Sequence, residues 1–320
     1  MKLVRSLLTL VLALVCAAAQ AQSFPARPVK IVVAFSPGGG TDIVARVLGQ
    51  KLTEMWGQQV IVENRAGASG TIGTEYAAKS APDGYTLFMG TLGNLSVNKH
   101  LYPKMTVDPI RDFAPITKVV DVYFVLVAHP SVPAKNVAEL IQLAKSKPGI
   151  VTYGSSGPGG APHLAAELFK RMAGVDMTHI PYKASAQSFQ DLLGGQVMLT
   201  MDSQIQALPY IRDGRLRALG VLSAKRSAQL PDVPTVGETV AGYELTNWFG
   251  LVAPAATPKE LLTKISADVS KALQDPGLRD KITALSAAVV GDTPEQFGAT
   301  MRADSDKWAR LIREANIKAE

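Results

Sequence analysis

Two glycine-rich stretches of this sequence combine backbone freedom with groups that bind anions. The first is FSPGGGTD at residues 35–42, and the second is GSSGPGGAPH at residues 154–163. Each follows a strand-like run and starts an amphipathic helical pattern. A helix N-terminus offers free N–H groups and about half a positive charge, which suit a carboxylate or a phosphate. Glycine has no Cβ to keep such an anion away. If both stretches face one cleft, we expect them to hold the two ends of one dianion.

Each stretch also carries one ionisable side chain whose role the sequence leaves open. Asp42 lies in the first turn of its helix, where it either stabilises the helix dipole or accepts a hydrogen bond from a ligand ammonium or hydroxyl. His163 lies in the first turn of the second helix and either caps and packs that helix or contacts a ligand. Both residues are therefore candidates for ligand binding.

The glycine pattern does not match the common nucleotide-binding loops or the nucleophile elbow. G-x-G-x-x-G needs glycine where Ile43 stands, and G-x-x-x-x-G-K-[ST] is absent. G-x-S-x-G needs glycine where Pro158 stands. An exported serine hydrolase that uses Ser155 or Ser156 with His163 remains the alternative from another functional class. No two of the four histidines have the i, i+4 spacing of a metal-binding helix, and we expect neither a metal nor another cofactor.

Strand-like and helix-like segments alternate along the chain, which predicts an α/β fold with parallel-rich sheets flanked by helices. The expected strands lie at residues 29–35, 59–64, 85–90, 150–154, 177–182, 196–202 and 216–222. The expected helices lie at residues 42–56, 71–80, 137–146, 162–173, 186–193 and 206–212. Three further helices are expected in the tail, because Pro258, Pro276 and Pro294 each precede a helical pattern.

Two long apolar runs, at residues 119–130 and 245–254, are expected to cross between two lobes of this fold. The predicted arrangement is a hinged clamshell in which the C-terminal helices return to the first lobe. We assign residues 22–123 plus 248–320 to the first lobe and 124–247 to the second, with hinges near residues 122–125 and 247–250.

The first 21 residues have the features of a secretory signal peptide. They contain two basic residues, an apolar run at residues 7–15 and the cleavage sequence Ala19-Gln20-Ala21. The only cysteine, Cys16, lies inside this segment, and Val15 before it disfavours a lipoprotein signal. We therefore expect an exported protein without disulfides or thiol chemistry.

The charge of the chain is mildly positive and evenly spread. It has 33 Lys and Arg against 27 Asp and Glu, a formal net charge of +6. Nucleic-acid binding usually needs a clustered basic stripe interleaved with aromatic residues, and the sequence contains none. We expect a small anionic ligand, no nucleic acid and a monomeric protein.

Eight segments resemble, in the same order, the Bug family, the extracytoplasmic solute receptors of tripartite tricarboxylate transporters. They are PVKIVVAFSPGGGTDIVAR, VIVENRAGASGTIG, DGYTLFMGTLGN, DFAPIT, YGSSGPGGAPHLAAELF, HIPYK, DLLGGQV and GRLRALGVLSAKRSAQLPDVPT. The resemblance implies a type II periplasmic binding protein of the Venus-flytrap kind. Its two lobes would close on a small carboxylated solute and hand it to the membrane subunits of a transporter. A ligand sensor for a signalling partner would use the same site and differ only in its docking surface.

The resemblance also implies which residues contact the ligand, through N–H groups, hydroxyls and ordered waters. In the first lobe these are Gly39, Gly40, Thr41 and Asp42, with Asn64, Thr91 and Asn94 at later strand ends. In the second lobe they are Ser155, Ser156, Gly157, His163, Tyr182 and Asp202.

The chain departs from the family pattern at three of its positions. After HIPYK the family usually has glycine and, three residues later, proline, where this chain has Ala184 and Gln187. Ala184 would narrow the cleft or shift the following turn, and Gln187 offers an amide to a polar ligand. Met201 stands before Asp202 where the family commonly has an aromatic residue. These departures bear on the identity of the ligand and leave the expected fold unchanged.

Overall fold

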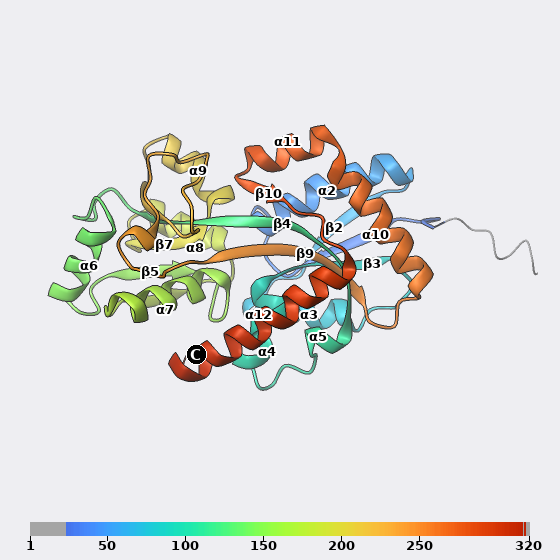
Figure 1. Ribbon diagram of the computed structural model, residues 1–320, viewed down its shortest axis with the longest axis horizontal. Helices are drawn as coiled ribbons and strands as arrows, with labels where there is room; N and C mark the ends of the chain where they lie inside the picture. The colour runs from blue at the N-terminus through green and yellow to red at the C-terminus, as the bar shows by residue number, and fades with distance from the viewer. Residues whose placement is uncertain (1–23, 316, 318–320) are drawn as a thin grey trace, which may run out of the picture.

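The computed structural model describes residues 24–315 and residue 317. The expected signal peptide, residues 1–21, lies outside these described residues. Figure 1 shows one group of helices from the middle of the chain, in green to yellow, and another from its two ends, in blue and in orange to red. Two long strands run between the two groups, which gives the molecule its two lobes.

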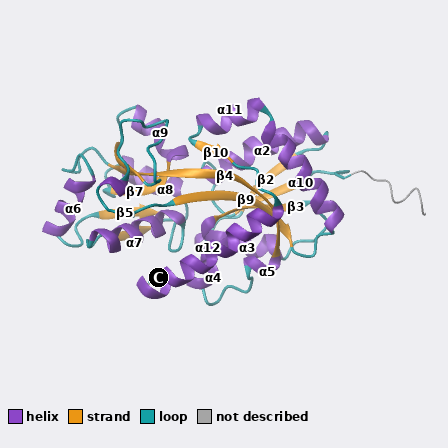
Figure 2. Ribbon diagram, in the orientation of Figure 1, coloured by secondary structure: helices purple, strands orange, loops and turns teal. Residues whose placement is uncertain are grey.

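A mixed sheet passes through both lobes (Figure 2). Its strands are β1 (Val29–Val33), β2 (Val60–Asn64), β3 (Thr86–Thr91), β4 (Phe113–Ala128), β5 (Thr152–Ser155), β6 (Thr178–Pro181), β7 (Leu199–Ser203), β8 (Arg217–Val221), β9 (Thr246–Pro254) and β10 (Ala287–Val289). β1 pairs in parallel with β2 and β3, and β5 pairs in parallel with β6 and β7. β9 and β4 pair antiparallel with their neighbours. The predicted α/β fold is confirmed, and its sheet is mixed because the crossing strands run against the strands beside them.

The two crossing strands confirm the expectation from the apolar runs. β4 pairs with β9 from Phe113 to Tyr123 and with β7 from Phe124 to Ala128. Most of its residues are buried. The strand starts six residues before the expected run because FAPITK, although less apolar, also pairs with β9. The position at which β4 changes partners lies within the expected hinge at residues 122–125.

Helices cover both faces of the sheet. They are α2 (Gly40–Trp56), α3 (Thr71–Ala78), α4 (Asn98–Leu101), α5 (Pro109–Asp112), α6 (Val137–Ser146), α7 (Ala161–Ala173), α8 (Ser185–Leu193), α9 (Gln204–Arg212), α10 (Lys259–Gln274), α11 (Pro276–Ala284) and α12 (Pro294–Ala315), with shorter turns η1 (Ala68–Gly70), η2 (Gly93–Val97) and η3 (Val236–Glu238). The three tail helices expected at prolines are present, and α10 and α12 pack on β4. None of the helices described is long and apolar enough to cross a membrane.

The apolar faces of these helices form the core against the sheet. Leu48 and Leu52 of α2 and Leu164 and Phe169 of α7 are fully buried. Burying one such side chain contributes roughly 1.5–3 kcal/mol relative to leaving it exposed. This packing fixes the positions of the helices, and therefore of their first turns, which lie beside the strand ends in both lobes.

Several short elements lie where the sequence predicted neither a helix nor a strand. The stretch after β3 contains the π-helical η2 and the short helices α4 and α5. β10 pairs antiparallel with β4 through Ala287, Ala288 and Val289. Long-range packing rather than a clear periodicity sets these short elements.

Candidate ligand-binding site

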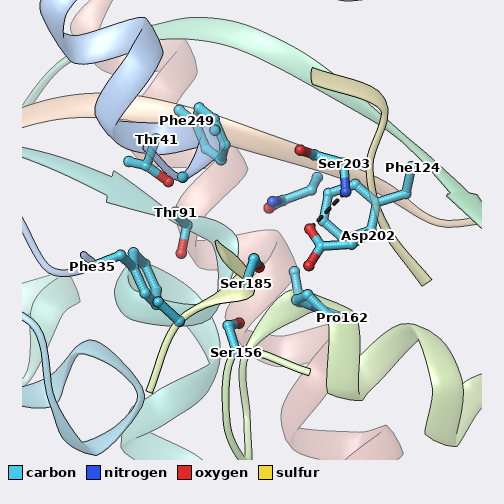
Figure 3. A pocket seen from close by; sticks show the side chains of 15 residues that line it. Phe35, Thr41, Thr91, Phe124, Ser156, Pro162, Ser185, Asp202, Ser203 and Phe249 are labelled. Carbon is cyan, nitrogen blue, oxygen red and sulfur yellow. Dashed lines mark hydrogen bonds between the residues drawn. The ribbon is translucent and has the colours of Figure 1, made fainter. Parts of the chain in front are cut away.

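A cavity lies at the crossing of the two lobes, where the strands end and the helices begin. Its empty volume is about 460 Å³, including the part open to solvent, which falls in the usual range for small-molecule sites. Figure 3 shows side chains from both lobes facing this space. The lining residues are Phe35, Gly39, Gly40, Thr41, Thr91, Phe124, Ser156, Ala161, Pro162, Ala184, Ser185, Asp202, Ser203, Asn247 and Phe249.

Four helix N-termini converge on this cavity. The residues before α2, α8 and α9 line it, and α7 contributes its first two residues. None of these four helices has a side-chain hydrogen bond at its N-cap, where the residues are Gly39, Gly160, Ala184 and Ser203. The first N–H groups of a helix have no partner within the helix. The cavity therefore faces several backbone donors and the positive ends of four helix dipoles, an arrangement that favours an anion.

The carboxylate of Asp42 binds protein groups instead of facing the cavity, and it holds the first glycine-rich stretch, residues 35–42, in place. It accepts hydrogen bonds from the backbone N–H of Gly38 at 2.9 Å, from Asn64 Nδ2 at 2.9 Å and from Arg46 Nε at 2.9 Å. Asn64 Nδ2 also donates to the carbonyl of Phe35 at 3.0 Å. Burial alone would raise the pKa of Asp42, but these hydrogen bonds outweigh it and lower the pKa. Asp42 and Asn64, both candidates from the sequence, thus position the loop and do not line the cavity.

In the second glycine-rich stretch, residues 154–163, Ser156 is the only candidate residue that lines the cavity. Ser155 is fully buried, and its Oγ lies 2.6 Å from His179 Nε2. The ring of His163 stacks on that of His179 with 4.4 Å between centroids, and His163 Nδ1 accepts a hydrogen bond from the N–H of Gly159 at 3.1 Å. Burial lowers the pKa of His163 to about 4 and that of His179 to about 3. Both rings are therefore neutral at physiological pH.

This geometry does not support the serine hydrolase alternative. Ser155 pairs with His179 rather than with His163, and a nucleophile without any exposed surface cannot reach a substrate. Ser156, which does face the cavity, makes no hydrogen bond to a histidine among the described residues. The two histidines instead stiffen the loop that carries Ser156.

Of four further candidate residues, one lines the cavity and three lie outside its lining. Thr91 lines the cavity, and its Oγ1 donates to Asn94 Oδ1 at 3.0 Å, so the buried Asn94 holds Thr91 from behind. Tyr182 donates from its hydroxyl to Asp191 Oδ2 at 2.6 Å and does not line the cavity. Gly157 is also absent from the lining and lies against Ser69, where a Cβ would come within 2.5 Å of Ser69 Oγ.

Asp202 is the ionisable side chain in the wall of the cavity. It is 4% exposed, and its Oδ1 accepts a hydrogen bond from the N–H of Ser203 at 2.6 Å. Burial raises the pKa of Asp202 to about 6, although the hydroxyl of Ser185 and the Ser203 N–H act in the opposite direction. Figure 3 shows Ser185 beside the carboxyl group, yet Asp202 Oδ2 has no partner that meets hydrogen-bond geometry.

Sequence reasoning missed several lining residues. Phe124 and Phe249 lie in the crossing strands, where an aromatic residue that faces a cavity has the same sequence pattern as one in the core. Phe35 and Ser203 each adjoin a candidate residue or segment, and their position next to a strand end was the signal that could have found them. The departures are now placed as well: Ala184 lines the cavity, and Gln187 Oε1 accepts from the N–H of Lys183 at 3.2 Å.

The two lobes touch across the cavity. A Cβ on Gly40 of the first lobe would lie 3.1 Å from Ser203 Oγ of the second. The hydroxyl of Tyr102 in the first lobe donates to the carbonyl of Pro158 in the second. The two lobes are therefore in contact on both sides of this region.

Comparison with known proteins places the chain in a family. Residues 44–317 match the family described as the tripartite tricarboxylate transporter family receptor. The chain is 37% identical to Protein BugT of Bordetella pertussis over 308 residues, which cover 95% of this chain and 94% of that protein.

Two solved structures with bound acids have the same fold. The R. palustris protein Rpa4515 with adipate has a TM-score of 0.90 and 37% identity, over 92% of this chain and 99% of that one. MatC (Rpa3494) from Rhodopseudomonas palustris with bound malate has a TM-score of 0.86 and 31% identity, over 90% of this chain and 100% of that one. The protein described here thus belongs to the tripartite tricarboxylate transporter receptors, a family of periplasmic solute-binding proteins and not of enzymes.

Proposed function

We propose that this protein is a periplasmic receptor that captures a small carboxylate in the cavity between its lobes and delivers it to a tripartite tricarboxylate transporter. Family membership supports this proposal, as do the adipate and the malate in two relatives of the same fold. The secretory features of residues 1–21 support export to the periplasm. Among the candidate residues, the proposed contacts are those in the cavity wall: Gly39, Gly40, Thr41, Thr91, Ser156 and Asp202.

The observation that carries the proposal is the convergence of four uncapped helix N-termini on one cavity. An anion at one such terminus gains about 0.3–1 kcal/mol at an exposed site and up to about 2 kcal/mol where it is partly buried. No Lys, Arg or His is present among the described residues that line the cavity. Backbone N–H groups and hydroxyls such as those of Thr41 and Ser156 would therefore bind the carboxylate.

Binding would close the two lobes about the crossing strands. The proposed first lobe comprises residues 22–123 and 248–320, and the second comprises 124–247. β4 changes its pairing partner between Tyr123 and Phe124, at the proposed boundary. Strands continuous through a lobe boundary restrict the motion to a hinge, as in other two-lobed binding proteins.

Native mass spectrometry of the freshly purified protein, with Gly40→Val as the control, tests this function. The proposal predicts that the wild-type protein carries a small acid that is lost on denaturation, or takes up one acid molecule when malate or adipate is added. The Gly40→Val protein should be folded and unliganded, because its side chain enters the cavity. If the wild type takes up no carboxylic acid from a broad panel, the proposed function is wrong.

A further inference from the structure

Three buried oxygen atoms in the cavity wall have no hydrogen-bond partner among the described residues. They are Asp202 Oδ2, Ser203 Oγ and Asn247 Oδ1. Asp202 is 4% exposed, and Ser203 and Asn247 are each 3% exposed. A buried polar atom without a partner destabilises the folded protein, so native proteins rarely keep such atoms without a reason. Two of them, Asp202 Oδ2 and Asn247 Oδ1, can only accept hydrogen bonds when Asp202 is ionised, which indicates that something in the cavity donates hydrogen bonds to this wall.

Asp202 distinguishes this wall from the helix ends around it. In the part of the cavity lining that the structure describes, it alone has an ionisable side chain, and no cationic side chain lines the cavity beside it. Its Oδ1 is held by the Ser203 N–H at 2.6 Å, which fixes the plane of the carboxyl group and leaves Oδ2 as the free acceptor. A ligand with only acceptor groups would place oxygen against oxygen here.

We propose that the ligand carries a hydrogen-bond donor, an ammonium or a hydroxyl, beside its carboxylate, and that Asp202 is the residue that selects for this donor. This inference rests on the function proposed above. The helix N-termini would hold the carboxylate, and Asp202 Oδ2 would accept from the neighbouring donor. Phe35, Phe124 and Phe249 line the rest of the cavity and would contact the apolar part of the ligand.

The other acidic candidate cannot serve this purpose. Asp42 already accepts from Gly38, Arg46 and Asn64. Asp202 Oδ2, in contrast, can accept a hydrogen bond from the ligand, and this bond would offset the cost of burying the carboxylate. Burial raises the pKa of Asp202 to about 6, so the group is mainly ionised at pH 7.5 and is an acceptor there.

Calorimetric titration with matched acids at pH 7.5 tests the selection. One series is succinate, malate and aspartate; a second is 3-phenylpropionate, phenyllactate and phenylalanine. Within each series the carbon skeleton is constant, and only the donor changes from none to hydroxyl to ammonium. We expect the tighter-binding series to show at least a tenfold lower Kd for a donor-bearing acid than for the unsubstituted acid. The identity of the preferred donor separates an amino acid ligand from a hydroxy acid ligand.

The variant Asp202→Asn attributes this preference to one atom. Asparagine has nearly the same shape and can keep the hydrogen bond from the Ser203 N–H, but it can place an NH₂ donor where Oδ2 was. The tenfold preference should disappear or reverse in favour of the unsubstituted acid. The control is Asp304→Asn, which makes the same change at a partly buried acid that accepts from Trp248 Nε1 outside the cavity lining. That control should keep the wild-type preference.

The outcomes distinguish a failure of the inference about Asp202 from a failure of the proposed receptor function. If unsubstituted acids bind as tightly as donor-bearing ones, or if Asp202→Asn keeps the wild-type preference, the inference about Asp202 is wrong while the receptor function stands. If no acid of either series or of the broader panel binds, the receptor function itself fails, and the inference fails with it.

Discussion

Replacing Gly40 with alanine should raise the stability of the protein and weaken its ligand binding. Gly40 is the first residue of α2 and has helical backbone geometry, so alanine fits the backbone. Exchanging a helical glycine for alanine stabilises a protein by up to about 1 kcal/mol. The added Cβ, however, would lie 3.1 Å from Ser203 Oγ of the other lobe and 3.6 Å from Phe249 Cζ.

The loss of affinity follows from this crowding between the lobes. A 3.1 Å contact is a few tenths of an ångström too short, so either the lobes stay slightly apart or Ser203 moves. Overpacking of this kind costs about 1–3 kcal/mol, and a cost of about 1–2 kcal/mol corresponds to a roughly 5–30-fold higher Kd. Gly40→Val adds two further methyl groups to that Cβ and should raise the Kd more than about 100-fold.

Calorimetry for the Kd and thermal unfolding without ligand measure the two effects separately. The matched control is Gly277→Ala in the first turn of α11, which gains a helical methyl group away from the cavity. Its Kd should equal that of the wild type. If both Gly40 variants bind as tightly as the wild type, the contact between α2 and Ser203 plays no part in binding, and the reasoning is wrong.

Three further predictions concern the groups that hold the site. Asp42→Ala leaves the N–H of Gly38 and the side chain of Asn64 without their acceptor, so unfolding should need about 1–3 kcal/mol less free energy and the Kd should rise; an unchanged melting temperature would contradict the bracing role of Asp42. Tyr102→Phe removes a hydrogen bond that spans the two lobes, worth about 1 kcal/mol, and should raise the Kd about fivefold with no change in ligand-free stability; an unaltered Kd would show that this contact does not stabilise closure. His163 and His179 have pKa values of about 4 and 3 in the folded protein, below the ordinary 6.5, so the unfolded chain binds more protons at pH values between the folded and the ordinary pKa. The free energy of unfolding should therefore be constant above pH 6.5 and fall by about 2 kcal/mol per histidine on lowering the pH to 5. Denaturant unfolding of His163→Gln should show a smaller dependence on pH.

The sequence predicted well those features that depend on neighbouring residues. The glycines and serines at strand ends marked the helix N-termini of α2 and α7, and Asp202 was identified at the end of β7. Such features are local, because a strand, a turn and the first helical residues lie within about ten positions of each other. The crossing of β4 and β9 was also predictable, since each is a long apolar run.

The features that escaped prediction depend on contacts between distant positions. Whether Asp42 faces a ligand or a protein group is decided by Asn64, the last residue of β2, which reaches Asp42 only after β1 and β2 have paired. The pairing of Ser155 with His179 likewise requires the parallel register of β5 and β6. The partner expected from the sequence was His163, because spacing along the chain does not reveal the register that brings His179 to Ser155.

The lobe boundaries and the expected monomer stay predictions. The aromatic lining of the cavity shows a further limit, because Phe124 and Phe249 lie in strands whose residues are mostly buried. An apolar residue there has the same pattern whether it meets another side chain or a ligand. Only the three-dimensional position of the strand ends reveals the difference.

The most direct test of the central claim is a calorimetric titration of one bound acid beside its primary amide. An acid held by uncapped helix N-termini depends on its negative charge, whereas the amide has nearly the same shape without it. We expect saturable binding of one acid molecule per protein and at least a 100-fold weaker affinity for the amide. Equal affinity for the acid and its amide would contradict the claim that the four helix N-termini form a carboxylate site.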